Sequence, residues 1–147
     1  MVADGDDPAG SSKDKYVLIK WDLSSIAPGT NVESSSVTLS VYDTSPQTYP
    51  IRLLKRPWTE AATWNAYDAG EAWEVAGARG ALDRDTATAA TVTPTSAGKV
   101  TLVVDRAVVQ GWVDDPSSNN GLIIADPTNA NGADFNSREA ADGSQRP

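Results

Sequence analysis

Tyr16–Leu23, YVLIKWDL, and Ser36–Tyr42, SVTLSVY, are the two stretches that decide the fold class of this chain. In both, the side chains alternate between two faces with a period of two residues, and β-branched and aromatic residues are frequent, as in β-strands. The side chains that the alternation turns inward are Val17, Ile19 and Trp21 in the first stretch and Val37, Leu39 and Val41 in the second. We therefore expect two strands that each bury one face.

Apolar runs of the same kind recur along the chain, and turn-forming residues separate them. The further strands that we expect are Pro50–Arg56, Lys99–Val104 and Gly121–Asp126, with a weaker candidate near Val92. The turn signals are Ala27–Asn31, Thr44–Pro50 and Ser117–Gly121. Short strands joined by turns predict an all-β fold, an antiparallel β-sandwich that forms a single domain over residues 1–147.

One short helix is expected directly after the strand that ends at Val104. Asp105 can cap the N-terminus of the run RAVVQGW, and Val108 and Trp112 then lie one turn apart on the same face. By contrast, Ala66–Ala90 shows little periodicity and predicts a long loop. The expected architecture is therefore a sandwich with one helix and one long excursion.

Charge and composition exclude several classes of function. The formal net charge is −8, which disfavours nucleic acid and anionic membranes as partners, and no run of apolar residues is long enough to span a bilayer. The chain has no cysteine and no histidine, so it cannot build a disulfide, a thiolate metal site or a catalytic triad. An enzyme made from this chain would have to rely on carboxylates, lysine or tyrosine.

Five blocks of the sequence together resemble DNRLRE-type domains, which are related to disaggregatase repeats. The blocks are KYVLIKWDLSSIAPGTNVESSSVTLSVY (15–42), WTEAATWN (58–65), AWEVAGARGALDRD (72–85), VTLVVDRAVVQGWVDDPSSNNGLIIAD (100–126) and FNSREAADGSQRP (135–147). They follow one another in the order and with the spacing of that family. The resemblance therefore covers nearly the whole chain.

The resemblance implies a jelly-roll-like β-sandwich from a secreted or cell-surface protein. Carbohydrate-binding module family 96, whose members bind alginate, is similar, and other relatives accompany polysaccharide lyases and hydrolases or belong to large surface proteins of the Rhs type. We therefore expect a non-catalytic module that binds an acidic polysaccharide beside a degrading enzyme. The alternative is a structural or adhesion module without a sugar site.

The ends of the chain depart from the family pattern. Family members usually have a strand before the first block and another after the last, whereas this chain opens on an acidic, loop-like stretch and stops at Pro147. Losing both terminal strands would expose a sheet edge, which favours pairing with a second copy. A trimmed or dimerising fragment is the expectation that follows.

The stretch WTEAATWN places Trp58 and Trp64 on either side of Glu60. The interpretation that we favour is structural: Trp58 ends a strand, Trp64 packs after a tight turn, and Glu60 accepts backbone N–H groups within that turn, because a buried tryptophan usually belongs to the core. The alternative is a platform on which a sugar ring stacks. Trp112, on the apolar face of the helix, is also expected in the core.

Other aromatic and basic residues predict a sugar-binding surface. Trp73 lies in a stretch without apolar periodicity, and Tyr42 lies outside the inward register, as do Tyr49 and Tyr67. Exposed rings of this kind suit the apolar faces of sugars. The basic residues form two groups along the chain, Lys13, Lys15 and Lys20 in one and Arg52, Lys55 and Arg56 in the other. If both groups share one sheet face, they form a strip for carboxylated sugars. Ordinary solvated charge on a strand face is the alternative, and taken alone the residues favour it.

Acidic residues raise two further alternatives. Asp4–Pro8 and Asp126–Asp134 are rich in Asp, Asn and Gly and could supply oxygen ligands to Ca²⁺, although turn formation alone explains both stretches. Paired carboxylates could catalyse glycoside hydrolysis, and the candidate pairs are Glu71 with Glu74 and Asp83 with Asp85. Neither pair carries a motif that fixes the separation this reaction needs, so we expect no enzyme activity.

Overall fold

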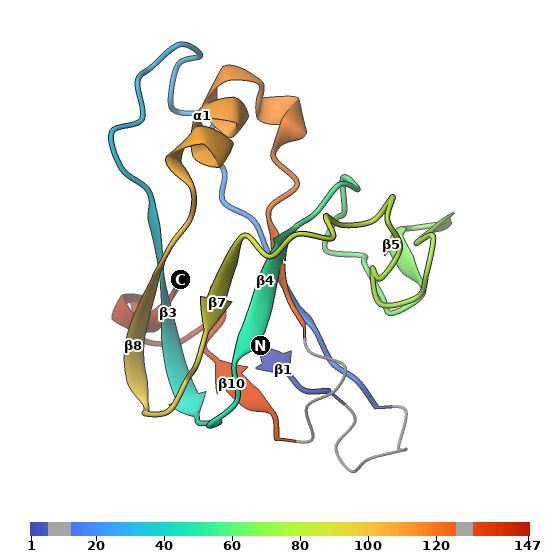
Figure 1. Cartoon of the computed structure of the whole chain (residues 1–147), viewed down its shortest axis with the longest axis vertical. Coiled ribbons are helices and arrows are strands. Elements are labelled where there is room, and N and C mark those ends of the chain that lie inside the picture. Colours follow the sequence, from blue (N-terminus) through green and yellow to red (C-terminus); the bar gives the residue numbers. More distant parts are fainter. Residues whose placement is uncertain (6–12, 126–130) are drawn as a thin grey trace.

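The computed structural model describes residues 1–5, 13–125 and 131–147, and it is a sandwich of two four-stranded antiparallel sheets with one α-helix (Figure 1). The first sheet has the strand order β1 (Val2–Ala3), β10 (Ala133–Phe135), β3 (Ser36–Asp43) and β8 (Gly98–Val103). The second has the order β2 (Val17–Ile19), β9 (Leu122–Ile124), β4 (Tyr49–Leu53) and β7 (Ala90–Val92). The predicted antiparallel β-sandwich is confirmed.

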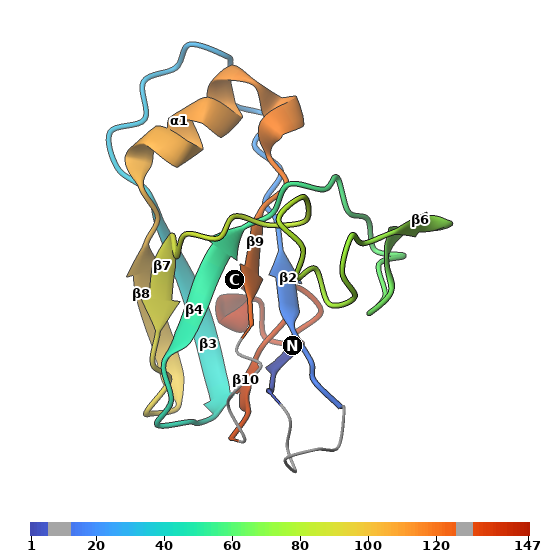
Figure 2. The same ribbon diagram turned by 45° about the vertical axis from the view of Figure 1, so that its right-hand side comes forward.

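The chain crosses from one sheet to the other at every connection between these eight strands except that from β4 to β7. This arrangement is jelly-roll-like, as predicted. The exception is a long excursion, residues 54–89, which leaves β4 and returns to β7 beside it (Figure 2). We call this excursion the 54–89 cover. It contains a small hairpin of β5 (Ala66–Asp68) and β6 (Glu71–Ala72), so the prediction of a plain loop there is wrong in part.

The main core lies between the two sheets, and it is built from the alternating positions that the sequence indicates. Val17, Ile19, Leu39 and Val41 are buried there, and Val37 packs against the same cluster. Phe135 of β10 and Tyr49 of β4 are fully buried beside them. Tyr49 was expected on the outer side of its strand; instead its ring enters the core and its hydroxyl donates to Ser45 Oγ at 3.1 Å.

A second, smaller core lies on the outer face of the second sheet, beneath the 54–89 cover. Ile123 at the centre of β9 is fully buried there with Leu54, Trp73 and Ala78 of the cover. All three residues of β9 are buried, because the main core covers one of its faces and the second core covers the other. A strand that is covered on both faces is apolar at successive positions, which explains why the stretch GLIIAD shows no alternation.

The helix α1 (Arg106–Asp114) lies across one end of the sandwich (Figure 2). Its predicted cap is confirmed, because the Asp105 carboxylate accepts the N–H of Ala107 at 2.8 Å. Trp112 is buried against the main core and Val108 packs partly against it, as their spacing predicts. Two short 3₁₀ helices follow, at Pro116–Ser118 and Gly143–Gln145. None of the helices in the described residues is both long and apolar enough to span a membrane.

The first residues of the chain form part of the first sheet rather than a loop. Val2 and Ala3 pair antiparallel with Asp134 and Ala133 of β10. The Phe135 N–H also donates to the Met1 carbonyl at 2.7 Å. The sequence did not indicate this strand, because two residues are too short to show a period.

Candidate functional site

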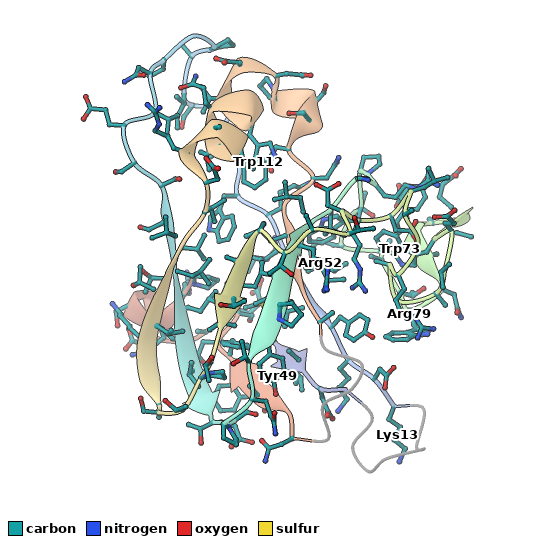
Figure 3. All side chains as sticks on the ribbon, viewed as in Figure 1. Lys13, Tyr49, Arg52, Trp73, Arg79 and Trp112 are labelled. Atoms are coloured by element: carbon teal, nitrogen blue, oxygen red, sulfur yellow. The ribbon has the colours of Figure 1, made fainter. Side chains whose placement is uncertain are left out.

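The predicted basic residues do not form one strip. Lys13, near the start of the described segment 13–125, lies well away from Arg52 and Arg79 (Figure 3). Lys15 lines a separate hollow of about 320 Å³ between the first strand of the second sheet and the cover. Lys20 lies beyond the end of β2, beside the ring of Trp58 at 5.5 Å.

Of the three basic residues predicted on the strand Pro50–Arg56, Arg52 lies on β4 and Lys55 lies beyond its end, and their environments differ. Arg52 is half-buried on the outer face of the second sheet, where its Nε donates to the Thr86 carbonyl at 3.5 Å. Lys55 is exposed, forms an ion pair with Asp85 at 3.0 Å and donates to the Ala81 carbonyl at 3.0 Å. Lys55 therefore already has a carboxylate partner, and its main role is to hold the cover.

Trp73 is not a surface ring. Its side chain is only 6 % exposed, and its indole N–H donates to the Thr63 carbonyl at 3.0 Å. Its ring lies 5.6 Å from that of Tyr67, which is half-buried. The prediction of Trp73 as a sugar-binding residue is therefore corrected: the second core supplies the apolar partners that the local sequence does not reveal. Tyr42, by contrast, is 57 % exposed as predicted.

The stretch WTEAATWN combines a structural role with surface exposure, but not as the sequence suggested. Trp58 is half-buried, and its indole N–H donates to the Asn120 carbonyl at 2.8 Å, which fixes the ring. Trp64 is 36 % exposed rather than core, and it packs against Tyr16 with ring centroids 5.0 Å apart. The predicted packing of Trp64 in the core is therefore wrong.

Glu60 also departs from its predicted role. The turn is held by Thr59, whose carbonyl accepts the Ala62 N–H at 2.9 Å and whose hydroxyl donates to Asp68 at 2.6 Å. Glu60 is exposed and instead lies 3.3 Å from Arg138, near the C-terminus of the chain. This pair brings the WTEAATWN turn next to the last segment.

A groove lies around Trp21. Two adjoining hollows of about 520 and 400 Å³ share the same six wall residues, Lys20, Trp21, Asp22, Trp58, Glu60 and Arg138, which define the Trp21 groove. A third hollow of about 490 Å³ continues past Trp21 toward the buried Trp112. Two half-buried tryptophans, Trp21 and Trp58, therefore line the groove, with the Lys20 ammonium 5.5 Å from the centre of the Trp58 ring.

The charged side chains of the Trp21 groove differ in whether they have a hydrogen-bond or ion-pair partner. Asp22 accepts the Ser24 N–H at 2.9 Å, and hydrogen bonds from the Ser24 side chain and backbone lower the pKa of its carboxyl. Glu60 is held by Arg138. Lys20 has no carboxylate within 4.0 Å among the residues that the structure describes.

Asn119 completes one wall of the Trp21 groove. Its amide nitrogen donates to the Trp21 carbonyl at 2.9 Å, which ties the groove to the segment before β9. Its Oδ1 is buried and has no donor within the described part of the chain. A buried acceptor without a donor marks a position where a water molecule or a polar ligand group would complete the hydrogen bonding.

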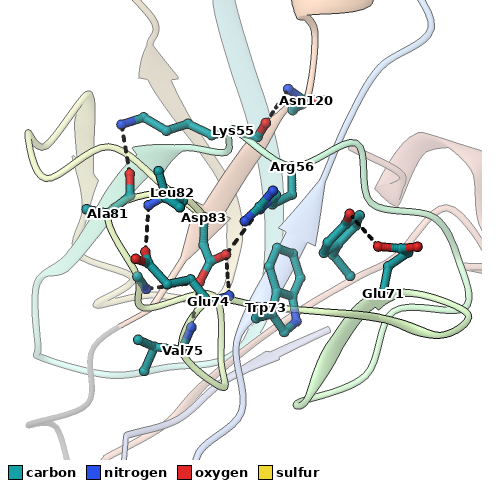
Figure 4. Close-up of polar contacts among 12 residues, drawn as sticks. Lys55, Arg56, Glu71, Trp73, Glu74, Val75, Ala81, Leu82, Asp83 and Asn120 are labelled. Atoms are coloured by element: carbon teal, nitrogen blue, oxygen red, sulfur yellow. Dashed lines mark hydrogen bonds and ion pairs between the residues drawn. The ribbon is translucent and has the colours of Figure 1, made fainter.

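The carboxylate pairs considered for catalysis are structural. Asp83 is fully buried and accepts the N–H groups of Glu74, Val75 and Gly80 at 2.8, 3.0 and 3.0 Å, and Arg56 lies 3.5 Å away (Figure 4). Burial would raise the pKa of Asp83, but these backbone donors and Arg56 outweigh it and hold the pKa below its ordinary value.

The other members of the two pairs are also engaged in the cover. The Glu74 carboxylate accepts the Leu82 N–H at 2.8 Å, and Glu71 accepts the Tyr67 hydroxyl at 3.1 Å (Figure 4). Asp85 is paired with Lys55. These four carboxylates hold the loop of the cover together, and none of them lines one of the hollows described above.

The two stretches considered for calcium lie largely outside the described residues, which include only Asp4 and Gly5 of the first and Asn131–Asp134 of the second. Within residues 1–5, 13–125 and 131–147, no three carboxylates gather closely enough to hold a metal ion. The rest of both stretches, residues 6–8 and 126–130, lies outside the described residues.

Comparison with family models, with curated proteins and with solved structures finds no match to this chain.

The Trp21 groove was not predicted from the sequence because its residues are distant along the chain and one of them was expected in the core. Trp21 was expected in the core by its register. It packs against the main core, but it lies beyond the end of β2 and is only half-buried, so part of its side chain is left at the surface. Asn119 and Arg138 are separated from it by about a hundred residues, and nothing in a single sequence brings them together.

Proposed function

We propose that this protein is a non-catalytic carbohydrate-binding module that binds an acidic polysaccharide in the Trp21 groove. The observation that carries the proposal is the groove itself, in which Trp21 and Trp58 present ring surface and Lys20 is a cation without a carboxylate partner among the described residues. Aromatic faces bind the C–H faces of sugars, and an ammonium group binds a uronate carboxylate.

The polar walls support the same function. Asn119 offers a buried oxygen without a donor, and Arg138 offers guanidinium nitrogens that are shared with Glu60 and Glu139 on an exposed side chain. Lys20 is the cation of the groove that has no carboxylate partner among the described residues, so we assign the preference for anionic sugars to it. The sequence resemblance points to the same ligand class and to a secreted or cell-surface protein that accompanies a polysaccharide-degrading enzyme.

Removing the cation of the groove should weaken binding selectively. We expect Lys20→Ala to reduce retardation by alginate and pectin in affinity gel electrophoresis about tenfold, with a smaller effect for Arg138→Ala, because single contacts in such grooves are weak. Lys99→Ala, a change of the same charge on β8 outside the groove, is the matched control. Xylan and a neutral glucan, each with and without EDTA, complete the set.

Each outcome of that experiment has a definite meaning. Retardation by the acidic polymers alone, lost in Lys20→Ala and kept in Lys99→Ala, supports the proposal. Equal retardation by the neutral glucan would overturn the acidic preference, and no retardation by any polymer would overturn sugar binding. Loss with EDTA would add a calcium ion to the site.

A structural or adhesion module is the second candidate, and the terminal strand β8 favours it. β8 ends the first sheet, and Val103 on this strand is 74 % exposed. Among the described residues no strand pairs with the outer edge of this six-residue strand, and such an edge can pair with a second copy. We expect a dimer by sedimentation velocity at high protein concentration, and Val103→Lys should weaken it while Val75→Lys in the cover should not. A monomer at every concentration would reject edge pairing.

A further inference from the structure

Two arginines meet on the outer face of the second sheet, outside the Trp21 groove. Leu54 forms an isolated antiparallel bridge with Arg84, so these two side chains point to the same side of the sheet. Arg52 lies two residues before Leu54 and therefore also points to that side. The carbonyl of Thr86, two residues after Arg84, accepts from Arg52 Nε, which confirms that the segments run side by side.

The register makes Arg52 and Arg84 diagonal neighbours. Across such a diagonal, long side chains reach one another. Arg79 is the third cation here: its Nε donates to the Ala76 carbonyl at 2.9 Å, and its guanidinium lies 5.7 Å from the centre of the Trp64 ring. Figure 3 shows Arg52 and Arg79 on the same side of the molecule. The positive charges of Arg52 and Arg79 both act on Arg84 and lower its pKa, after burial as the largest cause.

The carboxylates nearest in sequence form no ion pair with Arg52 or Arg84. Asp83 is bound by three backbone N–H groups and Arg56, and Asp85 is paired with Lys55. Neither Arg52 nor Arg84 has a carboxylate within 4.0 Å in the described segments. Like charges brought together repel one another. The Asp83 charge and Tyr16 act in the opposite direction and raise the pKa of Arg84, but burial and the two neighbouring arginines outweigh them, so the pKa stays lowered.

The Arg84 guanidinium has a buried nitrogen whose hydrogen bonding is incomplete. Its side chain is half-buried, and one terminal nitrogen, Nη1, is shut off from solvent without an acceptor in the structure. Leaving a charged N–H without an acceptor is costly, and such groups mark places where an ion or water completes the hydrogen bonding. The adjacent Arg52 has only one long hydrogen bond, to the Thr86 carbonyl.

We propose that Arg52 and Arg84, with Arg79 beside them, form an oxyanion-binding site that accepts a carboxylate, sulfate or phosphate group. Guanidinium groups bind such anions through pairs of parallel N–H···O hydrogen bonds, and two guanidinium groups from adjacent segments can hold one anion from two sides. The anion would supply the ion-pair partner that the neighbouring carboxylates do not. None of the three arginines lines the Trp21 groove, so this site does not depend on the proposed sugar binding there.

The site can be tested by NMR with simple anions. ¹⁵N-labelled protein is titrated with sodium sulfate, sodium phosphate or sodium acetate in exchange for chloride at constant ionic strength. We expect the Nε–Hε signals of Arg52 and Arg84 to shift and saturate with a dissociation constant of about 1 mM. The anion with the strongest binding identifies the source, since acetate stands for uronic acids, sulfate for sulfated sugars and phosphate for phosphorylated ligands.

Substitutions distinguish a specific anion-binding site from non-specific electrostatic attraction of anions to the protein. Arg52→Gln and Arg84→Gln should each weaken the anion at least tenfold, and Arg84→Lys, which keeps charge but not the planar group, should also weaken it. Arg106→Gln on the helix is the matched control, because Arg106 is exposed and donates to the Val32 carbonyl. Lys20→Ala should leave anion binding unchanged, which separates this site from the groove.

The opposite results would overturn the proposal. Shifts that rise linearly without saturation, or equally at Arg106, would mean general electrostatic attraction. Saturable binding that survives both Arg52→Gln and Arg84→Gln would place the anion elsewhere. Because Arg52→Gln alters a half-buried side chain outside the Asp83 bonds, it provides the test even if Arg84→Gln fails to fold.

Discussion

Replacing Asp83 with alanine is expected to lower the free energy of unfolding by about 3 to 5 kcal/mol, the range for removing one partner of a buried charge pair. The carboxylate is fully buried and binds three backbone N–H groups of the 54–89 cover together with Arg56. The truncated side chain would leave those donors and the Arg56 cation without their acceptor. Urea denaturation at pH 7 measures the change.

Asp85→Ala is the matched control for that variant. Its carboxylate belongs to the same loop, but it is 39 % exposed and forms a surface ion pair with Lys55. Surface pairs contribute about 0 to 1 kcal/mol, so the control should unfold almost as the parent does. Equal losses for the two variants would show that Asp83 does not organise the cover.

The same residue predicts how stability depends on pH. The folded-state pKa of Asp83 lies below its ordinary value of 3.8, so the folded state favours the ionised form more strongly than the unfolded state does. Its contribution is therefore present above the unfolded pKa and is lost as the pH falls through the folded pKa. The stability difference between the parent and Asp83→Asn should shrink below about pH 4. A difference that stays constant from pH 7 to pH 2.5 would contradict this assignment.

The regular part of the fold could be predicted because its signal is local. Period-two alternation indicated β2 and β3, and a single capping aspartate indicated α1. β9 was also indicated, since a strand covered on both faces is apolar at every position. These features depend on neighbours within a few residues, which the sequence shows directly.

The second core could not be predicted, and the errors in the site follow from it. Trp73 has no apolar neighbours along the chain, so its burial depends on Ile123 and Leu54, which are distant in sequence. The outward positions of β4 were expected to face solvent, but the 54–89 cover lies over them. Arg52 therefore meets Arg84 rather than Lys20, a pairing that requires knowledge of how the cover returns along β4.

Gly121→Ala is the other substitution expected to have a large effect, about 2 to 5 kcal/mol in the free energy of unfolding. Gly121 has φ +74°, a conformation that costs an L-residue about 1 to 2 kcal/mol. A Cβ there would also collide with the Ile19 carbonyl and lie 2.9 Å from Lys20 Cβ, and backbone atoms cannot move aside as a flexible side chain can. Thermal unfolding compared with Gly29→Ala gives the measurement.

Gly29 is the matched control because it has a similar φ of +83° but open space around its Cα. The difference between the two variants therefore isolates the collision from the backbone strain. The collision also reaches the Trp21 groove, since Asn119 and Asn120, which hold the Trp21 carbonyl and the Trp58 indole, directly precede Gly121. We expect Gly121→Ala to weaken polysaccharide retardation at temperatures where it is still folded, whereas Gly29→Ala should not. A destabilised variant with unchanged binding would show that the groove tolerates movement of this turn, and it would count against a preformed site.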